Sequence, residues 1–262
     1  MLHPLYHSRM TTLDSGTVSV AVADGIGTIT FHHPKSNSLP GALLARLAEA
    51  VTSLGGDAAA RVILLRSEGK AFCGGASFDE LKAITTAEEG TRFFSGFKDL
   101  ILAMVRAPKF VVTRVHGKAV GGGVGVVAAS DYALATEAAA VRLSELAVGI
   151  GPFVVGPVIE RKVGLGAFGA MAVDADWRDA AWAERHGLYA HVSPDVTALD
   201  VSVAALCGRL AASNPEAMAR LKRVFWEGTE QWPQLLAERA AASGSLVLSE
   251  FTRRAIAAAG GG

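Results

Sequence analysis

The sequence has little cysteine, no excess of charge of either sign and no long apolar run. Cys73 and Cys207 are its two cysteines in 262 residues, so a disulfide framework is excluded and the reducing cytoplasm is the expected compartment. The 25 basic residues balance 25 acidic ones, which argues against nucleic acid or an anionic membrane as the main partner. No apolar run reaches the roughly 20 residues that span a bilayer, so we expect no membrane partner either.

Hydrophobic residues make up 50% of the chain and charged residues 19%, a composition typical of a folded protein with a sizeable core. The first ten residues lack the cationic and apolar segments of an export signal, and we expect residues 1–14 to form a flexible extension. Residues 15–195 are expected to form the core. From about residue 196 the pattern is that of helices, which predicts a C-terminal helical region over residues 196–262.

Strand patterns and helix patterns alternate along the chain. An Asp24-Gly25 turn joins two short alternating runs and predicts a hairpin. Further strands are expected at residues 62–66, 110–115, 131–136, 141–143 and 188–192, and helices at 40–54, 91–104, 180–187, 199–210, 214–226 and 232–256. This alternation predicts an α/β core with largely parallel pairing.

A glycine cluster at residues 116–125 follows the apolar run 110–115, which predicts a strand, a tight turn and then a helix. Three interpretations compete. Gly123, Gly125 and Ala128, with Glu145 further on, match the relaxed dinucleotide-binding fingerprint, although that fingerprint belongs to the first strand-helix unit of its domain and over a hundred residues precede it here. The glycines could instead let a helix pack tightly on a sheet. The third interpretation is an oxyanion hole, which needs a second donor elsewhere.

A second glycine turn supplies that donor. Residues 71–81 again place clustered glycines between a predicted strand and a predicted helix. Two such units, each offering backbone N–H groups at a glycine turn, are what a two-donor oxyanion hole requires. The adjacent pair His32 and His33 has no Cys, Asp or third His at ligand spacing, so we interpret both as surface histidines and expect no metal.

Three segments carry a family resemblance. Residues 71–76 (AFCGGA) resemble the first oxyanion motif of the enoyl-CoA hydratase/isomerase (crotonase) superfamily, and residues 117–123 (GKAVGGG) resemble its second. Residues 143–152 (LSELAVGIGP) resemble the segment that carries its catalytic carboxylate. The three occur in the family's order, and the likeness extends over roughly residues 15–260.

The resemblance implies a crotonase-like ββα spiral core with a C-terminal helical trimerisation region, assembled as a homotrimer or a dimer of trimers. It also implies an acyl-CoA thioester as substrate, with no cofactor besides the coenzyme A of that substrate. The backbone N–H groups of Ala76 and Gly122 would hold the thioester oxygen, and Glu145 would be the acid/base. The residues implied to line the acyl-CoA path are Ser38, Ser77, Phe78 and Asp79, with Lys222 near the nucleotide end.

The sequence departs from the family pattern at two positions. Hydratases with two glutamates carry the first where this chain has Gly125, and some family isomerases and dehalogenases carry an aspartate where it has Phe153. Glu145 is then the one acid left, unless it is a structural carboxylate at a helix start that Ser144 caps.

One acid leaves three activities open. The likeness to the bacterial methylglutaconyl-CoA hydratase branch, whose members also have glycine at the first position, favours hydration of a 2-enoyl-CoA. A Δ3-Δ2 enoyl-CoA isomerase needs one base and is the first alternative. A non-catalytic acyl-CoA binder is the second.

Overall fold

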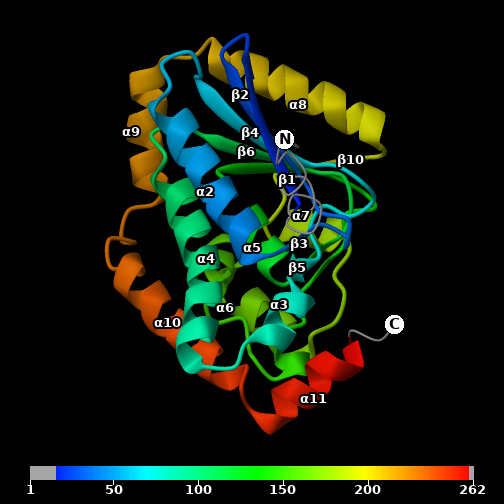
Figure 1. Ribbon diagram of the computed structural model, residues 1–262. Helices are drawn as coiled ribbons and strands as arrows, with labels where there is room; N and C mark the ends of the chain where they lie inside the picture. The colour runs from blue at the N-terminus through cyan, green and yellow to red at the C-terminus, as the bar shows by residue number, and fades with distance from the viewer. Residues whose placement is uncertain (1–15, 260–262) are drawn as a thin grey trace, which may run out of the picture.

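The computed structural model describes residues 16–259, so the predicted extension at residues 1–14 lies outside the described part (Figure 1). A six-stranded sheet has the order β1-β2-β4-β6-β8-β10. Its first two strands are antiparallel and the rest are parallel, as the sequence predicted. The strands are β1 (Thr17–Ala23), β2 (Ile26–His32), β4 (Val62–Ser67), β6 (Val111–Val115), β8 (Tyr132–Thr136) and β10 (His191–Ser193).

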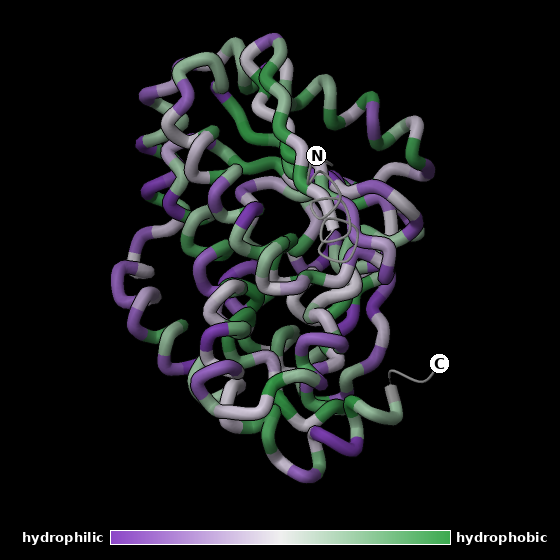
Figure 2. Tube along the Cα trace, viewed as in Figure 1, coloured by the Kyte–Doolittle hydropathy of each residue, from purple (hydrophilic) through white to green (hydrophobic). Residues whose placement is uncertain are grey.

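Both faces of this sheet are covered by helices, and Figure 2 shows hydrophobic residues gathered along its central strands. Side chains alternate between the two faces of a strand, and in β4 Ile63 and Leu65 enter the main core while Val62 and Leu64 enter a second, smaller one. The main core lies against α2 (Gly41–Gly56) and α4 (Ala87–Arg106). The smaller core lies against α8 (Val196–Ala211), so the first helix of the C-terminal region packs on the sheet (Figure 1).

Two small parallel sheets stand beside the large one and bring the glycine turns together. One pairs β3 (Ser38–Leu39) with β5 (Gly75–Ala76), and the other pairs β7 (Ala119–Val120) with β9 (Val141–Arg142). A bridge between Cys73 and Ala119 links them, and Val120 N donates to Cys73 O at 2.9 Å. Two segments more than forty residues apart thereby become neighbours.

The remaining elements are helical. They are α3 (Phe78–Ala83), α5 (Gly122–Ala128), the short 3₁₀ helix η1 (Leu146–Val148), α6 (Gly156–Asp174), α7 (Ala180–Arg185), α9 (Pro215–Phe225), α10 (Trp232–Leu246) and α11 (Glu250–Ala259). The single helix predicted over residues 232–256 is wrong, because Ser249 Oγ accepts from Thr252 N and starts a new helix there. No single described helix is long and apolar enough to cross a membrane; the one pair that passes by length and composition together, α8 with α9, is bent by 112°.

Candidate active site

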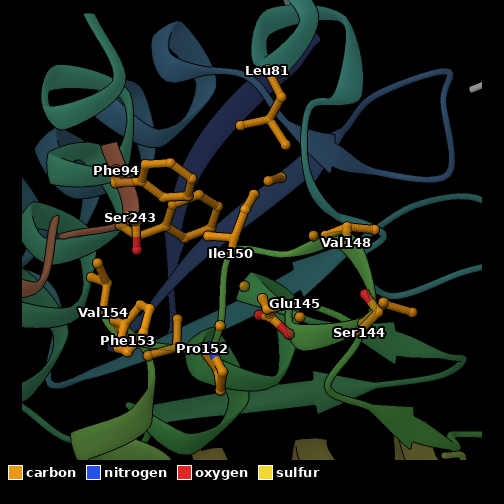
Figure 3. Close-up of a pocket in the computed structure, with 18 of the residues that line it drawn as sticks. Leu81, Phe94, Ser144, Glu145, Val148, Ile150, Pro152, Phe153, Val154 and Ser243 are labelled. Carbon is orange, nitrogen blue, oxygen red and sulfur yellow. The ribbon is translucent and has the colours of Figure 1, made fainter. Parts of the chain in front are cut away.

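A cavity opens where the two glycine turns meet α4, α10 and residues 144–155 (Figure 3). Most of its wall is apolar or aromatic: Phe78, Leu81, Phe94, Phe97, Val148, Ile150, Phe153, Val154 and Val155. Ala76, Gly122 and Glu145 all line it. The structure therefore brings the predicted acid/base and the two predicted N–H donors to one cavity.

Glu145 is the one ionisable residue among those that line this cavity within residues 16–259. Its Oε2 is buried without a hydrogen-bond partner among the described residues. Burial raises the pKa of the carboxyl to about 7, and its own and Ser144's backbone amides oppose that rise. A carboxyl whose pKa is near neutrality can both accept and return a proton at physiological pH.

The backbone of Gly121 packs closely against the Glu145 side chain. Gly121, at φ +53°, faces it so closely that a Cβ atom there would lie 2.9 Å from Glu145 Oε1. Glu145 directly precedes η1, which has no side-chain cap. The alternative in which Ser144 caps a helix is therefore wrong, and Ser144 lines the cavity instead.

The N–H groups of Ala76 and Gly122 are oriented by their elements. Ala76 is paired with Leu39, whose oxygen accepts from Ser77 N at 3.3 Å. In a parallel ladder, the residue paired with the one that accepts this bond directs its own N–H away from the neighbouring strand. The N–H of Ala76 therefore points away from β3. Gly122 begins α5, so its N–H has no intrahelical partner. A Cβ atom on Gly75 would lie 3.5 Å from Gly122 N, which shows how closely the two turns approach.

The glycine cluster at residues 116–125 contains a short strand, one turn residue and the start of a helix, so the predicted turn is shorter than the cluster. Gly121 is the turn residue, and α5 begins at Gly122. A Cβ atom would come within 2.7 Å of Cys73 Cβ at Gly123 and within 2.5 Å of Val155 Cγ1 at Gly125. These contacts support the tight-packing interpretation. The dinucleotide interpretation is wrong, because protein atoms fill the space where a pyrophosphate would approach the glycines.

Comparison with known proteins agrees with this geometry. The sequence matches the family described as "Enoyl-CoA hydratase/isomerase" over residues 21–253. This chain belongs to that family. A Rhodobacter capsulatus protein named "Probable enoyl-CoA hydratase" is 29% identical over 245 residues, 92% of this chain and 94% of that protein.

Solved structures show the same fold. An enoyl-CoA hydratase from Mycobacterium smegmatis superimposes with a TM-score of 0.77 at 30% identity, covering 89% of this chain and 91% of that one. One from Bacillus halodurans superimposes with a TM-score of 0.84 at 20% identity, covering 92% and 99%. The α/β fold with a C-terminal helical region is therefore the crotonase fold, as the sequence motifs indicated.

Apolar side chains lie at or beside the two positions at which this chain departs from the family pattern. The side chain of Val155 lies directly against Gly125, so the space beside that position is filled by a valine. Phe153, at the other variant position, contributes an aromatic ring to the cavity wall. Glu145 is then the one acid at the positions to which the resemblance pointed, and apolar groups lie at or beside the other two.

The predicted path residues lie in different places. Phe78 lines the cavity, whereas Ser38, Ser77 and Asp79 do not. Ser77 Oγ accepts from Glu80 N as the cap of α3, and Ser38 Oγ lies 3.1 Å from His33 Nδ1. Asp79 is exposed and pairs with Lys35, which holds the pKa of that carboxyl below its usual range. Their contact with an acyl-CoA stays a prediction.

Two predictions are corrected by burial. The Lys222 side chain is 2% exposed, and its Nζ binds Asp131 Oδ2 at 2.8 Å, Met104 O at 2.7 Å and Lys109 O at 2.8 Å. All three ammonium hydrogens are then used within the protein, so none remains for a nucleotide. His33, interpreted as a surface residue, is buried, and Lys35 N donates to its Nδ1 at 3.2 Å.

Some wall residues carry no signal that sequence reasoning could use. Phe94 and Phe97 fall within the helix predicted over residues 91–104, and a helix pattern does not separate core from cavity wall. Ser243 lies on α10, about a hundred residues beyond Glu145, with no motif around it. Neither group could be assigned to the site without the fold.

Proposed function

We propose that this protein adds water reversibly to the double bond of a 2-enoyl-CoA thioester, with Glu145 as its single acid/base. The observation that carries the proposal is the buried Glu145 carboxylate, whose Oε2 has no hydrogen-bond partner among the described residues, in the same cavity as Ala76 and Gly122. The names of the family and of its relatives support hydration as the reaction. Coenzyme A is part of the substrate, so the proposal needs no separate cofactor.

The steps follow from charge and proton balance. The N–H groups of Ala76 and Gly122 bind the thioester oxygen and draw electrons from C3. Glu145 removes a proton from a water molecule while the oxygen of that water bonds to C3, and the electron pair of the double bond moves to form an enolate. The enolate charge rests on the oxygen held by the two donors. Glu145 then returns the proton to C2, which completes the addition of one water.

An isomerase is the second candidate, because one observation favours it. No other ionisable side chain among the described residues lines the cavity, and valine fills the space beside Gly125. A single base suffices to move a proton from C4 to C2 of a 3-enoyl thioester through a dienolate that the same donors stabilise.

One experiment separates these activities. The protein is incubated with crotonyl-CoA, and the absorbance of the conjugated 2-enoyl thioester is followed. Loss of absorbance with a mass gain of one water supports hydration. No change with crotonyl-CoA, but a rise in absorbance from a 3-enoyl-CoA, supports the isomerase. Binding without either reaction would leave a non-catalytic acyl-CoA binder.

The pH profile is a direct consequence of the proposed role. Because burial raises the pKa of Glu145 to about 7, its basic form is lost as the pH falls through that value. We expect kcat/KM for crotonyl-CoA to fall about tenfold per pH unit below pH 7 and to level off above it. A profile that stays flat down to pH 5.5 would show that another group is the base.

The proposed assembly is a homotrimer or a dimer of trimers. Large apolar side chains are exposed on several helices, among them Leu165, Val173, Val201, Val224 and Phe251. Such surfaces are commonly buried between subunits. Light scattering is expected to give about three or six times the 27.1 kDa chain mass, and a strictly monomeric species would contradict this proposal.

A further inference from the structure

The cavity wall contains a hydroxyl that the proposed reaction does not use. Ser243, on α10, is 1% exposed and lines the cavity. Figure 3 shows it beside Phe94, on the side of the cavity opposite Ser144. No hydrogen bond within residues 16–259 involves its Oγ, and because that atom is not one of the fully enclosed, unpartnered side-chain atoms, it keeps some access to the cavity space.

A close helix contact holds Ser243 in this position. α10 packs along α4, and at Gly244 a Cβ atom would lie 2.4 Å from Thr91 N. The two backbones therefore touch at the residue next to Ser243. Because this contact fixes the backbone of α10, the hydroxyl sits in a rigid wall.

The missing hydrogen bond is informative because a helical serine has local partners at hand. Ser245, two residues further along α10 and outside the cavity, donates to Ala242 O at 2.9 Å. Serines in helices commonly bond to a carbonyl of the preceding turn in this way. Ser243 does not, although it lies among aromatic and aliphatic side chains, where an unpaired hydroxyl is unfavourable.

We propose that Ser243 is a specificity residue that hydrogen-bonds a neutral oxygen substituent, a hydroxyl or a carbonyl, on the acyl chain of the substrate. This inference rests on the proposed function, since it assigns the acyl group to this cavity. A neutral group fits because no cationic side chain among the described residues lines the cavity to balance a carboxylate. The apolar remainder of the wall would contact the carbon chain.

Binding of unreactive thioesters tests this inference without requiring turnover. Saturated acyl-CoA thioesters of four to six carbons are compared with their ω-hydroxy counterparts by calorimetry. We expect the wild type to bind at least one hydroxylated member about tenfold more tightly than its parent. Ser243→Ala should abolish that preference, while Ser245→Ala, on the same helix, should keep it.

The outcomes distinguish this inference from the proposed function. If both series bind but the wild type shows no preference within any pair, Ser243 is an ordinary part of the wall and the inference is wrong. A Ser243→Ala variant that keeps the preference would also contradict it. If Ser243→Ala slows hydration of crotonyl-CoA and binding shows no preference, Ser243 holds the attacking water instead. If neither series binds, the proposed function itself fails and the inference fails with it.

Discussion

Replacing Glu145 with glutamine is expected to lower the turnover of a 2-enoyl-CoA by about 10²–10⁴-fold, because the substitution removes the one base that lines the cavity among residues 16–259. Glutamine keeps the size of the side chain, and the Ala76 and Gly122 N–H groups belong to the backbone. The affinity for a saturated acyl-CoA should therefore change little. Steady-state kinetics and calorimetry measure the two effects separately.

The thermal stability of this variant tests the burial of the Glu145 charge independently of activity. The folded-state pKa of Glu145, about 7, lies above its ordinary value of 4.5, so the folded protein holds this proton more tightly than the unfolded chain. That difference stabilises the wild type below pH 4.5 and is lost as the pH rises through 7. At pH 8 the wild type buries a charge that glutamine lacks. Glu145→Gln should accordingly melt at a higher temperature than the wild type.

A surface substitution completes the comparison. Glu238 lies on α10 and pairs with Gln234 outside the cavity, so Glu238→Gln should leave both turnover and binding unchanged. Full activity in Glu145→Gln would contradict the assignment of the base.

Replacing Lys222 with methionine is expected to lower the free energy of unfolding by about 3–5 kcal/mol, the usual effect of removing one partner of a buried ion pair. Methionine keeps most of the apolar stem but leaves Asp131 without its ion-pair partner, with the charge of Lys162 acting on it only through space. The remaining partners of Asp131 are Val111 N and Trp226 Nε1, at 2.7 and 2.9 Å. Urea denaturation measures the loss.

The same variant tests the corrected role of Lys222. Its ammonium binds Asp131 and two backbone carbonyls, so the folded variant should keep the wild-type affinity for acyl-CoA. Arg220→Met is the matched control on α9, because Arg220 and Glu216 form an exposed pair whose loss should cost under about 1 kcal/mol. A Lys222→Met protein of normal stability and weakened acyl-CoA affinity would restore the nucleotide-binding role predicted from the sequence.

The parts of the site that the sequence predicted are those set by local backbone chemistry. Glycine turns between strands and helices indicate free N–H groups wherever they occur, and the family resemblance pointed to Ala76 and Gly122 within those turns. The motif that contains Glu145 is likewise continuous in sequence. The six-stranded sheet was predictable in outline for the same reason, since each strand is a short local pattern.

What escaped prediction depends on contacts between distant segments. Val155 fills the space beside Gly125 only because α6 and α5 meet there, and Ser243 enters the cavity through a contact between α10 and α4. Lys222 was misassigned because its partner Asp131 is about ninety residues away in sequence. Periodicity shows that a side chain is buried, but it does not show what the side chain is buried against.

A crystal structure of the Glu145→Gln variant with crotonyl-CoA would show where the substrate binds, because the slow variant should preserve the bound substrate. We expect the thioester oxygen to lie about 3 Å from both Ala76 N and Gly122 N. The side-chain amide introduced by the substitution should lie against C2 and C3 of the acyl group. A thioester oxygen that contacts neither backbone amide, or an acyl group bound outside this cavity, would contradict the proposed function.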